Sequence, residues 1–332
     1  MKGFVPTPSA LVDRMVNKLF DGLPPDDGTT LLDPGCGTGA FIEGVLRWGE
    51  RTGGRLPAIT GIDSDPRLLA EAKGRLGSAA GVQLVETDFL GALDGQFDYI
   101  VGNPPYVPIT GLSTAEREAY RRRFTTATGR FDLYTLFFEQ ALRLLKPGGR
   151  LVFVTPEKFS YVESAGRLRS KLSEAGIREI EFIAESTFGD LVTYPVVTTI
   201  DRNHNYSGTR VLLRTGKSLA VRLPASGRSW LPLFNGAAHS HNPHSIADAF
   251  TRISCGVATG ADQIFVVKDD NLSHELQPFA YATISGRSLV RGEEIRTSHS
   301  MLVPYSADGV LLPETGLGPL GEYLRRPDYY SR

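Results

Sequence analysis

The sequence predicts an α/β protein with a doubly wound, mostly parallel, Rossmann-like sheet and a smaller C-terminal module. Apolar runs of strand length alternate with helical patterns over residues 9–200, as in parallel sheets that carry helices on both faces. The first such run leads directly into a glycine turn and a helix start, DPGCGTGAFI at 33–42. With 332 residues, the chain is long enough for two domains.

Seven strands and five helices are expected in the first part of the chain. The expected strands are Thr30–Leu32, Ala58–Ile62, Val82–Glu86, Tyr99–Val101, Leu151–Thr155, Glu179–Ile183 and Val196–Ile200. The expected helices are Ser9–Phe20, Gly39–Gly49, Pro66–Leu76, Leu133–Leu145 and Ser164–Ala175. The last two strands follow each other without a helix, which predicts an antiparallel hairpin at the edge of the sheet.

A change in composition marks the end of this pattern. Residues 201–250 are richer in Asn, Ser, Gly, Pro and His and show little periodicity, which indicates a boundary. We expect one domain over residues 1–215 and a second over 216–332. Short strand candidates such as Gln263–Val267 lie among Gly and Pro loops, so the second domain is predicted to be α+β or mostly β.

Composition excludes several classes of protein. No apolar run approaches the ~20 residues of a membrane span, and the N-terminus lacks the apolar core of a signal peptide, so a cytoplasmic protein is expected. The only cysteines, Cys36 and Cys255, lie far apart, which disfavours a disulfide framework. A net charge of −1 gives no overall signature of nucleic-acid binding, although a local basic face remains compatible with it.

The glycine turn points to a ligand at the end of the first strand. Gly35, Gly37 and Gly39 allow a tight turn and a close approach of the backbone to a ligand. Cys36 within the turn is interpreted as a small packing residue. The turn has no GK[ST] sequence and lacks the G-x-G-x-x-G spacing of nicotinamide enzymes. An adenosine ligand without a phosphate chain therefore fits better than ATP or NAD.

Acidic residues follow the next two strands at the same expected edge of the sheet. Asp63 ends the second strand, where a carboxylate can accept both hydroxyls of a ribose. Asp65 precedes a proline and is interpreted as a helix cap. After the third strand, Asp88 can accept a hydrogen bond from an exocyclic amine, and Phe89 can pack on an adenine ring.

These residues resemble the S-adenosylmethionine-dependent methyltransferases. The resemblance rests on DPGCGTG at 33–39, TDF at 87–89 and GNPPY at 102–106. GNPPY is similar to the catalytic motif of enzymes that methylate a planar amino nitrogen. Three groups share it: N6-adenine DNA methyltransferases, certain N6-adenine RNA methyltransferases, and glutamine N5-methyltransferases that act on release factors.

Further segments resemble the gamma-type N6-adenine DNA methyltransferases of restriction–modification systems. They are GFVPTPSALVDRMV at 3–16, RFDLYTLFFEQALRLLKPGGRLVFVTP at 130–156, FGDLVTYPVVTTI at 188–200, GVATGADQIFVV at 256–267 and ISGRSLVRGEEIRTSHSMLVPY at 284–305. The last two look like parts of a target-recognition domain, which implies that role for residues 216–332. In that family the domain continues past the position of Tyr305, so a shortened recognition domain is expected here.

The resemblance implies a cofactor, S-adenosylmethionine, with S-adenosylhomocysteine as product, and a set of residues that bind it. The implied cofactor-binding residues are Thr7, Pro8, Asp33, Pro34, Gly35, Gly37, Gly39, Asp63, Ser64, Asp88, Phe89 and Asn103.

The resemblance also implies the catalytic residues Asn103, Pro104, Pro105, Tyr106 and Phe188. The Asn103 side chain and the Pro104 carbonyl would accept the two N6 hydrogens, because the prolines end the strand and fix the backbone. Tyr106 and Phe188 would stack on a base extruded from the duplex. Tyr194 is an alternative second stacking residue.

The expected partners are double-stranded DNA and a restriction or specificity subunit, with a chain that is monomeric on its own. Candidate DNA-binding residues are Arg121, Arg122, Arg123, Arg287, Arg291 and Arg296, although a solvated helix face explains the first three equally well. His239, His241 and His244 favour a polar linker over a zinc site, and no metal is expected. The alternatives are a glutamine or RNA methyltransferase, or a recognition subunit of a larger defence complex.

Overall fold

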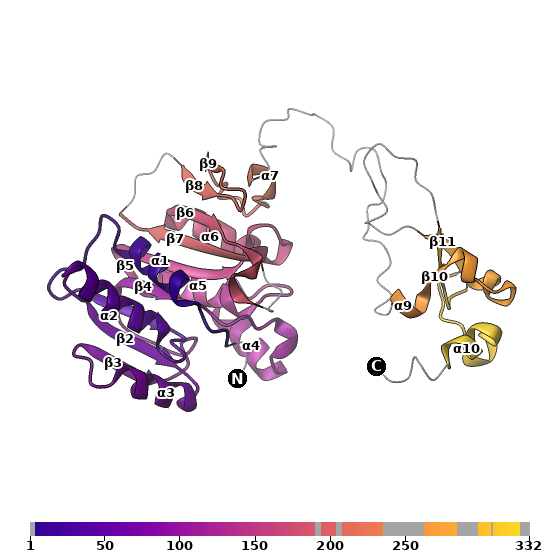
Figure 1. Ribbon diagram of the computed structural model, residues 1–332, viewed down its shortest axis with the longest axis horizontal. Helices are drawn as coiled ribbons and strands as arrows, with labels where there is room; N and C mark the ends of the chain where they lie inside the picture. The colour runs from indigo at the N-terminus through magenta and orange to yellow at the C-terminus, as the bar shows by residue number, and fades with distance from the viewer. Residues whose placement is uncertain are drawn as a thin grey trace. The chain divides into compact units, whose positions relative to one another are not determined.

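The computed structural model describes residues 4–189, 194–203, 208–234, 262–283, 298–306 and 308–325. The chain divides into two compact units, Met1–His241 and Asn242–Arg332, and Figure 1 shows the elements of each. In the described parts, no helix combines the length and apolar character needed to cross a membrane.

The first unit is built on a nine-stranded sheet in the order β3-β2-β1-β4-β5-β7-β6-β8-β9. The strands are β1 (Thr30–Pro34), β2 (Ala58–Asp63), β3 (Val82–Glu86), β4 (Phe97–Gly102), β5 (Leu145–Pro156), β6 (Ile177–Phe182), β7 (Pro195–Asp201), β8 (Thr209–Leu212) and β9 (Ser218–Val221). The five strands from β3 to β5 run parallel, and β7 pairs antiparallel with both β5 and β6. All seven expected strands are therefore present, and β8 and β9 extend the sheet beyond the expected hairpin.

Helices cover both faces of this sheet. The described helices of the first unit are α1 (Ser9–Phe20), α2 (Ala40–Thr52), α3 (Pro66–Leu76), α4 (Thr114–Arg123), α5 (Leu133–Leu144), α6 (Gly166–Ala175) and α7 (Leu231–Phe234). Alternate residues of β4 enter two separate hydrophobic clusters: Tyr99 and Val101 pack with α1 and α2, whereas Ile100 packs with α5 and α6. Since side chains alternate along a strand, one apolar run serves both faces, and the predicted doubly wound fold is confirmed.

Helix α4 was not among the five expected helices, although a solvated helix face was one explanation of Arg121, Arg122 and Arg123. It buries none of its residues, so it carries no apolar stripe that periodicity could reveal. Its start is fixed by a capping box, in which the Ser113 side chain accepts from the Glu116 amide and the Glu116 carboxylate accepts from the Ser113 amide. The S-x-x-E spacing is the signal that could have identified it.

The boundary expected at residue 215 lies too early. Strands β8 and β9 pair onto β6 and complete the same sheet. Beyond them, Trp230 is fully buried with its ring edge-on to Phe159, and Phe234 packs edge-on against Phe182. The first unit therefore continues to His241, because residues 208–234 supply both strands and core to it.

The second unit contains a three-stranded antiparallel sheet in the order β10-β12-β11. Its elements are α9 (Asp262–Phe265), β10 (Val266–Lys268), β11 (Ala280–Thr283), β12 (His299–Leu302) and α10 (Gly318–Leu324). Leu276, Leu302 and Leu320 form its small core. The strand candidate at 263–267 is wrong in its first part, because the chain is helical up to Phe265.

Candidate active site

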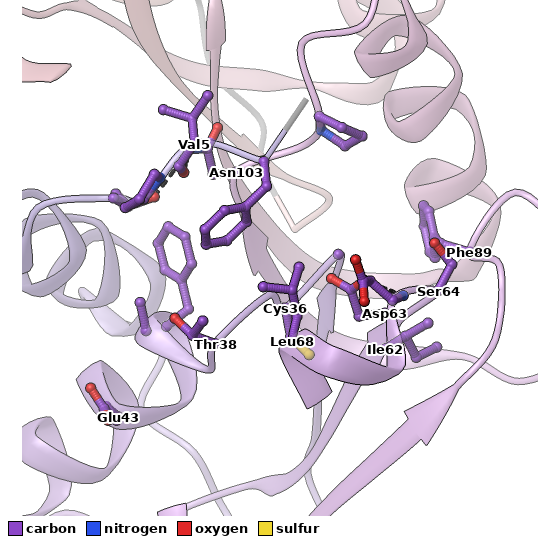
Figure 2. A pocket seen from close by; sticks show the side chains of 18 of the residues that line it. Val5, Cys36, Thr38, Glu43, Ile62, Asp63, Ser64, Leu68, Phe89 and Asn103 are labelled. Atoms are coloured by element: carbon purple, nitrogen blue, oxygen red, sulfur yellow. Dashed lines mark hydrogen bonds between the residues drawn. The ribbon is translucent and has the colours of Figure 1, made fainter. Parts of the chain in front are cut away.

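The carboxyl ends of β1, β2, β3 and β4 meet at one edge of the sheet, and a cavity of about 700 Å³ lies there. Figure 2 shows its lining. The lining includes Phe4, Val5, Pro6, Thr7, Gly35, Cys36, Ile62, Asp63, Ser64, Thr87, Asp88, Phe89, Asn103, Pro105 and Phe137. This is the edge at which open α/β sheets bind ligands, and the volume suits a nucleoside-sized molecule.

The glycine turn adopts the backbone conformation that its sequence predicts. Gly35, Gly37 and Gly39 have φ values of 72°, 55° and 86°, which disfavour any residue with a Cβ atom. The amides of Gly35 and Cys36 donate to the Ile62 carbonyl at 2.7 and 2.8 Å, and the Gly37 amide donates to Asp63 Oδ2 at 2.9 Å. These donors are used within the protein, which agrees with a ligand that has no phosphate chain.

The two acids at the ends of β1 and β2 have different environments. Asp63 lines the cavity and accepts from the Gly37 and Asp65 amides, each through one oxygen. Its remaining lone pairs can accept from a ligand. Asp33 is fully buried, and within the described residues neither of its oxygens has a hydrogen-bond partner. Burial, with the nearby Asp63 charge, raises the pKa of Asp33 well above its usual range. A direct ligand role remains a prediction for both acids.

The end of β3 contributes an acid and an aromatic ring. Asp88 lines the cavity while its Oδ1 accepts from the Leu90 amide at 2.9 Å. Phe89 is buried, and its ring lies 4.8 Å from that of Phe137, with both rings at the cavity wall. Asp65 also lines the cavity, and it caps α3 by accepting from the Arg67 amide, so its predicted role as a cap is confirmed.

Asn103 follows β4 and lines the cavity, close to Val5 (Figure 2). Its amide nitrogen Nδ2 donates to the Val5 carbonyl and to Thr7 Oγ1, both at 3.1 Å. Its oxygen Oδ1 is buried and has no partner among the described residues. A buried acceptor without a donor costs free energy unless water or a ligand supplies that donor, so this oxygen is available to accept from a ligand N–H.

The residues that follow Asn103 are fixed against the start of α5. The Leu133 amide donates to the Val107 carbonyl at 2.8 Å, and the Ile109 amide donates to the Phe131 carbonyl at 3.1 Å. Between these points and Asn103, the Tyr106 hydroxyl is buried without a partner in the described structure, and burial raises the pKa of Tyr106. Stacking of Tyr106 on a base stays a prediction.

Neither candidate for the second stacking residue lines the cavity. Phe188 ends a 3-10 turn, Glu185–Phe188, and is partly buried against the hydrophobic cluster of α1 and α2. Tyr194 is 45% exposed, with the Arg214 guanidinium 5.6 Å from its ring centroid. The choice between them stays a prediction.

Some implied cofactor residues lie next to the cavity without lining it. Pro8 precedes the first residue of α1, Pro34 ends β1, and Gly37 and Gly39 form the turn behind the wall. Phe4 and Val5 line the cavity but were not identified from the sequence. Val5 contributes through its carbonyl, which no side-chain pattern could reveal.

The candidate DNA-binding arginines are only partly described. Arg121 donates to the Gly129 carbonyl at 3.4 Å, Arg123 donates to the Gly91 carbonyl, and Arg122 lies 4.0 Å from Glu118 with 73% of its side chain exposed. Arg287, Arg291 and Arg296, like His239, His241 and His244, lie outside the described residues. Among the residues described, no cluster of His, Cys, Asp or Glu could hold a metal ion. Cys36 is buried in the core, which confirms its packing role.

We expect Gly37→Ala to weaken binding of S-adenosylhomocysteine by about tenfold, or ~1.4 kcal/mol, because a Cβ at this position would displace the Phe4 ring from the cavity wall. The new methyl group would lie 2.4 Å from Phe4 Cε2 at the cavity. Isothermal titration calorimetry measures the change. Gly28→Ala is the matched control, since Gly28 also has a positive φ but no described residue lies within 4 Å of the methyl group it would gain. Equal affinities of the two variants would contradict this view of the turn.

Comparison with known proteins agrees with this geometry. Residues 70–188 match the family of Eco57I restriction-modification methylases. Type II methyltransferase M.PaeR7I of Pseudomonas aeruginosa is 29% identical over 278 residues, which cover 74% of this chain and 47% of that protein. Type II methyltransferase M.XhoI of Xanthomonas vasicola is 27% identical over 278 residues, covering 73% of this chain and 50% of that protein. The chain thus spans about half the length of these relatives.

The fold also has a counterpart among solved structures. A protein from Listeria monocytogenes, described as a class I S-adenosylmethionine-dependent methyltransferase, superimposes with a TM-score of 0.50 and 21% identity. The match covers 61% of this chain and 62% of that one. S-adenosylmethionine is the cofactor of this class of methyltransferases. The family match and the shared fold therefore agree with the cofactor expected from the sequence. The chain has the class I methyltransferase fold and is a relative of the Type II restriction–modification methyltransferases.

Proposed function

We propose that the protein transfers the methyl group of S-adenosylmethionine to N6 of an adenine in double-stranded DNA, within a restriction–modification system. The observation that carries the proposal is Asn103 Oδ1, which is buried beside a nucleoside-sized cavity and has no hydrogen-bond partner among the described residues. The family that matches residues 70–188 is described as restriction-modification methylases, and the two relatives are described as Type II methyltransferases. DNA as substrate and N6 as the methylated atom belong to the proposal.

The proposed chemistry depends on hydrogen-bond acceptors. The lone pair of an adenine amine is delocalised into the ring, so the amine must be oriented before it can attack a methyl group. Asn103 Oδ1 and the Pro104 carbonyl would accept its two hydrogens and direct the lone pair toward the cavity. S-adenosylmethionine supplies the electrophilic methyl group. No strong base is needed, since the chain's contribution is positional and electrostatic.

Base and cofactor would occupy adjoining sites. Asp63 would accept the ribose hydroxyls, Asp88 the exocyclic amine of the cofactor, and Phe89 would pack on its adenine ring. A base inside a duplex cannot reach the cavity, so the target adenine would be extruded and stacked on Tyr106, with Phe188 or Tyr194 on its other face.

DNA binding would involve both units. Arg121, Arg122 and Arg123 on α4 follow the catalytic segment in sequence and would contact phosphates. Residues 242–332 would act as the target-recognition domain, with contacts from Arg287, Arg291 and Arg296. Association with a restriction or specificity subunit, and a monomeric state in its absence, complete the proposal.

A transfer assay tests the proposed function. The protein is incubated with methyl-labelled S-adenosylmethionine and mixed-sequence duplex DNA, and the DNA is digested to nucleosides. We expect label in N6-methyladenine. Parallel reactions contain a release factor or structured RNA, and label in either of those without label in DNA would overturn the proposal. A reaction that requires an added partner subunit would instead indicate a subunit of a larger complex.

A further inference from the structure

A short N-terminal segment, Phe4–Thr7, crosses the cavity and contacts Asn103 before the chain enters α1. We refer to Phe4–Thr7 as the strap. All four of its residues line the cavity, and Figure 2 shows Val5 close to Asn103. The strap thus belongs at once to the wall of the cofactor cavity and to the surroundings of Asn103.

The strap determines which end of the Asn103 amide faces the substrate. A backbone carbonyl can only accept hydrogen bonds, so the Val5 carbonyl requires the nitrogen of Asn103 on its side. Thr7 Oγ1 accepts at the same distance, 3.1 Å, and both amide hydrogens are then directed at the strap. Oδ1 is left as the group that can accept from a ligand. The flipped amide would present two donors to the donors of the substrate amine.

The strap is itself held at both ends. At one end the Phe4 ring lies against the glycine turn, so close that a Cβ on Gly37 would be 2.4 Å from it. At the other end the Pro8 carbonyl accepts from the Leu11 and Val12 amides in the first turn of α1. Leu11 and Val12 are buried in the core. The two acceptors are therefore fixed relative to the sheet that carries Asn103.

We infer that Thr7 is a positioning residue, which acts with the Val5 carbonyl to keep Asn103 Oδ1 directed at the substrate amine. The inference rests on the proposed function for its consequence in catalysis, but the contact itself exists without substrate. The Val5 carbonyl belongs to the backbone, so of the two acceptors only Thr7 Oγ1 can be removed by a side-chain substitution.

Two variants of nearly the same size separate this role from cofactor binding. Thr7→Val keeps the shape of the side chain and removes the oxygen, whereas Thr7→Ser keeps the oxygen and removes a methyl group. Loss of one hydrogen bond of about 1.4 kcal/mol corresponds to about tenfold. We expect kcat for methyl transfer to fall about tenfold in Thr7→Val and to recover in Thr7→Ser. KM for DNA should change little. Although Thr7 lines the cofactor cavity, its hydroxyl is used by Asn103, so the dissociation constant for S-adenosylhomocysteine should change much less than kcat.

A second measurement needs no substrate. In protein labelled with nitrogen-15 at asparagine, the side-chain amide signal of Asn103 is assigned by its loss in Asn103→Asp. We expect its hydrogens to exchange with solvent about tenfold faster in Thr7→Val than in the wild type or Thr7→Ser, following the same hydrogen-bond energy. Thermal unfolding of each variant verifies that the fold is retained.

Several outcomes would overturn the inference. Unchanged amide exchange in Thr7→Val would show that Thr7 does not hold Asn103. Equal losses in Thr7→Ser and Thr7→Val would assign the effect to packing. A loss confined to S-adenosylhomocysteine affinity would make Thr7 a cofactor ligand. If the wild type transfers no methyl group to DNA, the proposed function fails. The exchange measurement still tests whether Thr7 holds the Asn103 side-chain amide.

Discussion

Asn103→Ala is expected to lower kcat for methyl transfer to DNA by on the order of 10²- to 10³-fold, the usual effect of removing one hydrogen-bonding group aimed at the reacting centre. The substitution removes Oδ1, the buried acceptor that has no partner among the described residues. The substrate amine would then lose one of its two proposed acceptors. Single-turnover kinetics with saturating cofactor measure the chemical step directly.

Binding of the cofactor should be nearly unchanged in the same variant, because Asp63, Asp88 and Phe89 are untouched. Titration with S-adenosylhomocysteine checks this point. Asn17→Ala is a suitable control, since Asn17 accepts from Arg51 on the exposed surface of the helices and should leave both quantities unaltered. If Asn103→Ala lost cofactor affinity together with transfer, Asn103 would be a cofactor ligand and its assignment to the substrate amine would be wrong.

Arg150→Met is expected to reduce the free energy of unfolding by about 3–5 kcal/mol, the usual cost of leaving a buried charge unpaired. Arg150 is 3% exposed and Asp201 4% exposed. The guanidinium donates twice to Asp201 Oδ2, at 3.0 and 2.5 Å. It also donates to the carbonyls of Lys18, Leu19 and Asp21, which caps the C-terminal end of α1.

Chemical denaturation followed by circular dichroism measures this effect. Arg178→Met is the matched control, because the Arg178–Asp21 pair lies at the same helix end but Asp21 is 65% exposed, and such pairs contribute about 0–1 kcal/mol. Arg178 also lies 4.0 Å from Asp201, so the two variants differ in the direct hydrogen bonds that only Arg150 makes to Asp201. Asp201→Asn combined with Arg150→Met should recover part of the loss, since the buried negative charge is then removed. If Arg150→Met lowers the free energy of unfolding no more than Arg178→Met does, the buried Arg150–Asp201 pair does not stabilise this unit as expected.

Much of the first unit could be predicted from the sequence, because its strands are short apolar runs whose alternate residues enter different cores. β4 is an example: its single run supplies Tyr99 to one cluster and Ile100 to the other. The positions of Asp63 and Asn103 could be predicted for the same reason, since Asp63 ends one strand that the pattern locates and Asn103 comes after the end of another.

Other features depend on interactions that local sequence does not encode. The true boundary follows from pairing of β8 with β6 and from burial of Trp230, both of which join distant segments. Helix α4 lacks an apolar face, so periodicity could not detect it. The orientation of the Asn103 amide depends on the backbone carbonyl of Val5, which any residue type would provide.

The position of α1 in the fold has a consequence for synthesis of the chain. Lys18 binds Glu179, and Arg178 binds Asp21, across separations of 161 and 157 residues. At about 5–20 residues per second, a ribosome needs roughly 10–30 s to bridge such a distance. During that time the apolar side of the first helix lacks its last partners. We expect this helix to be the segment of the nascent first unit that engages chaperones, and the strap in front of it to be ordered only when the sheet is nearly complete.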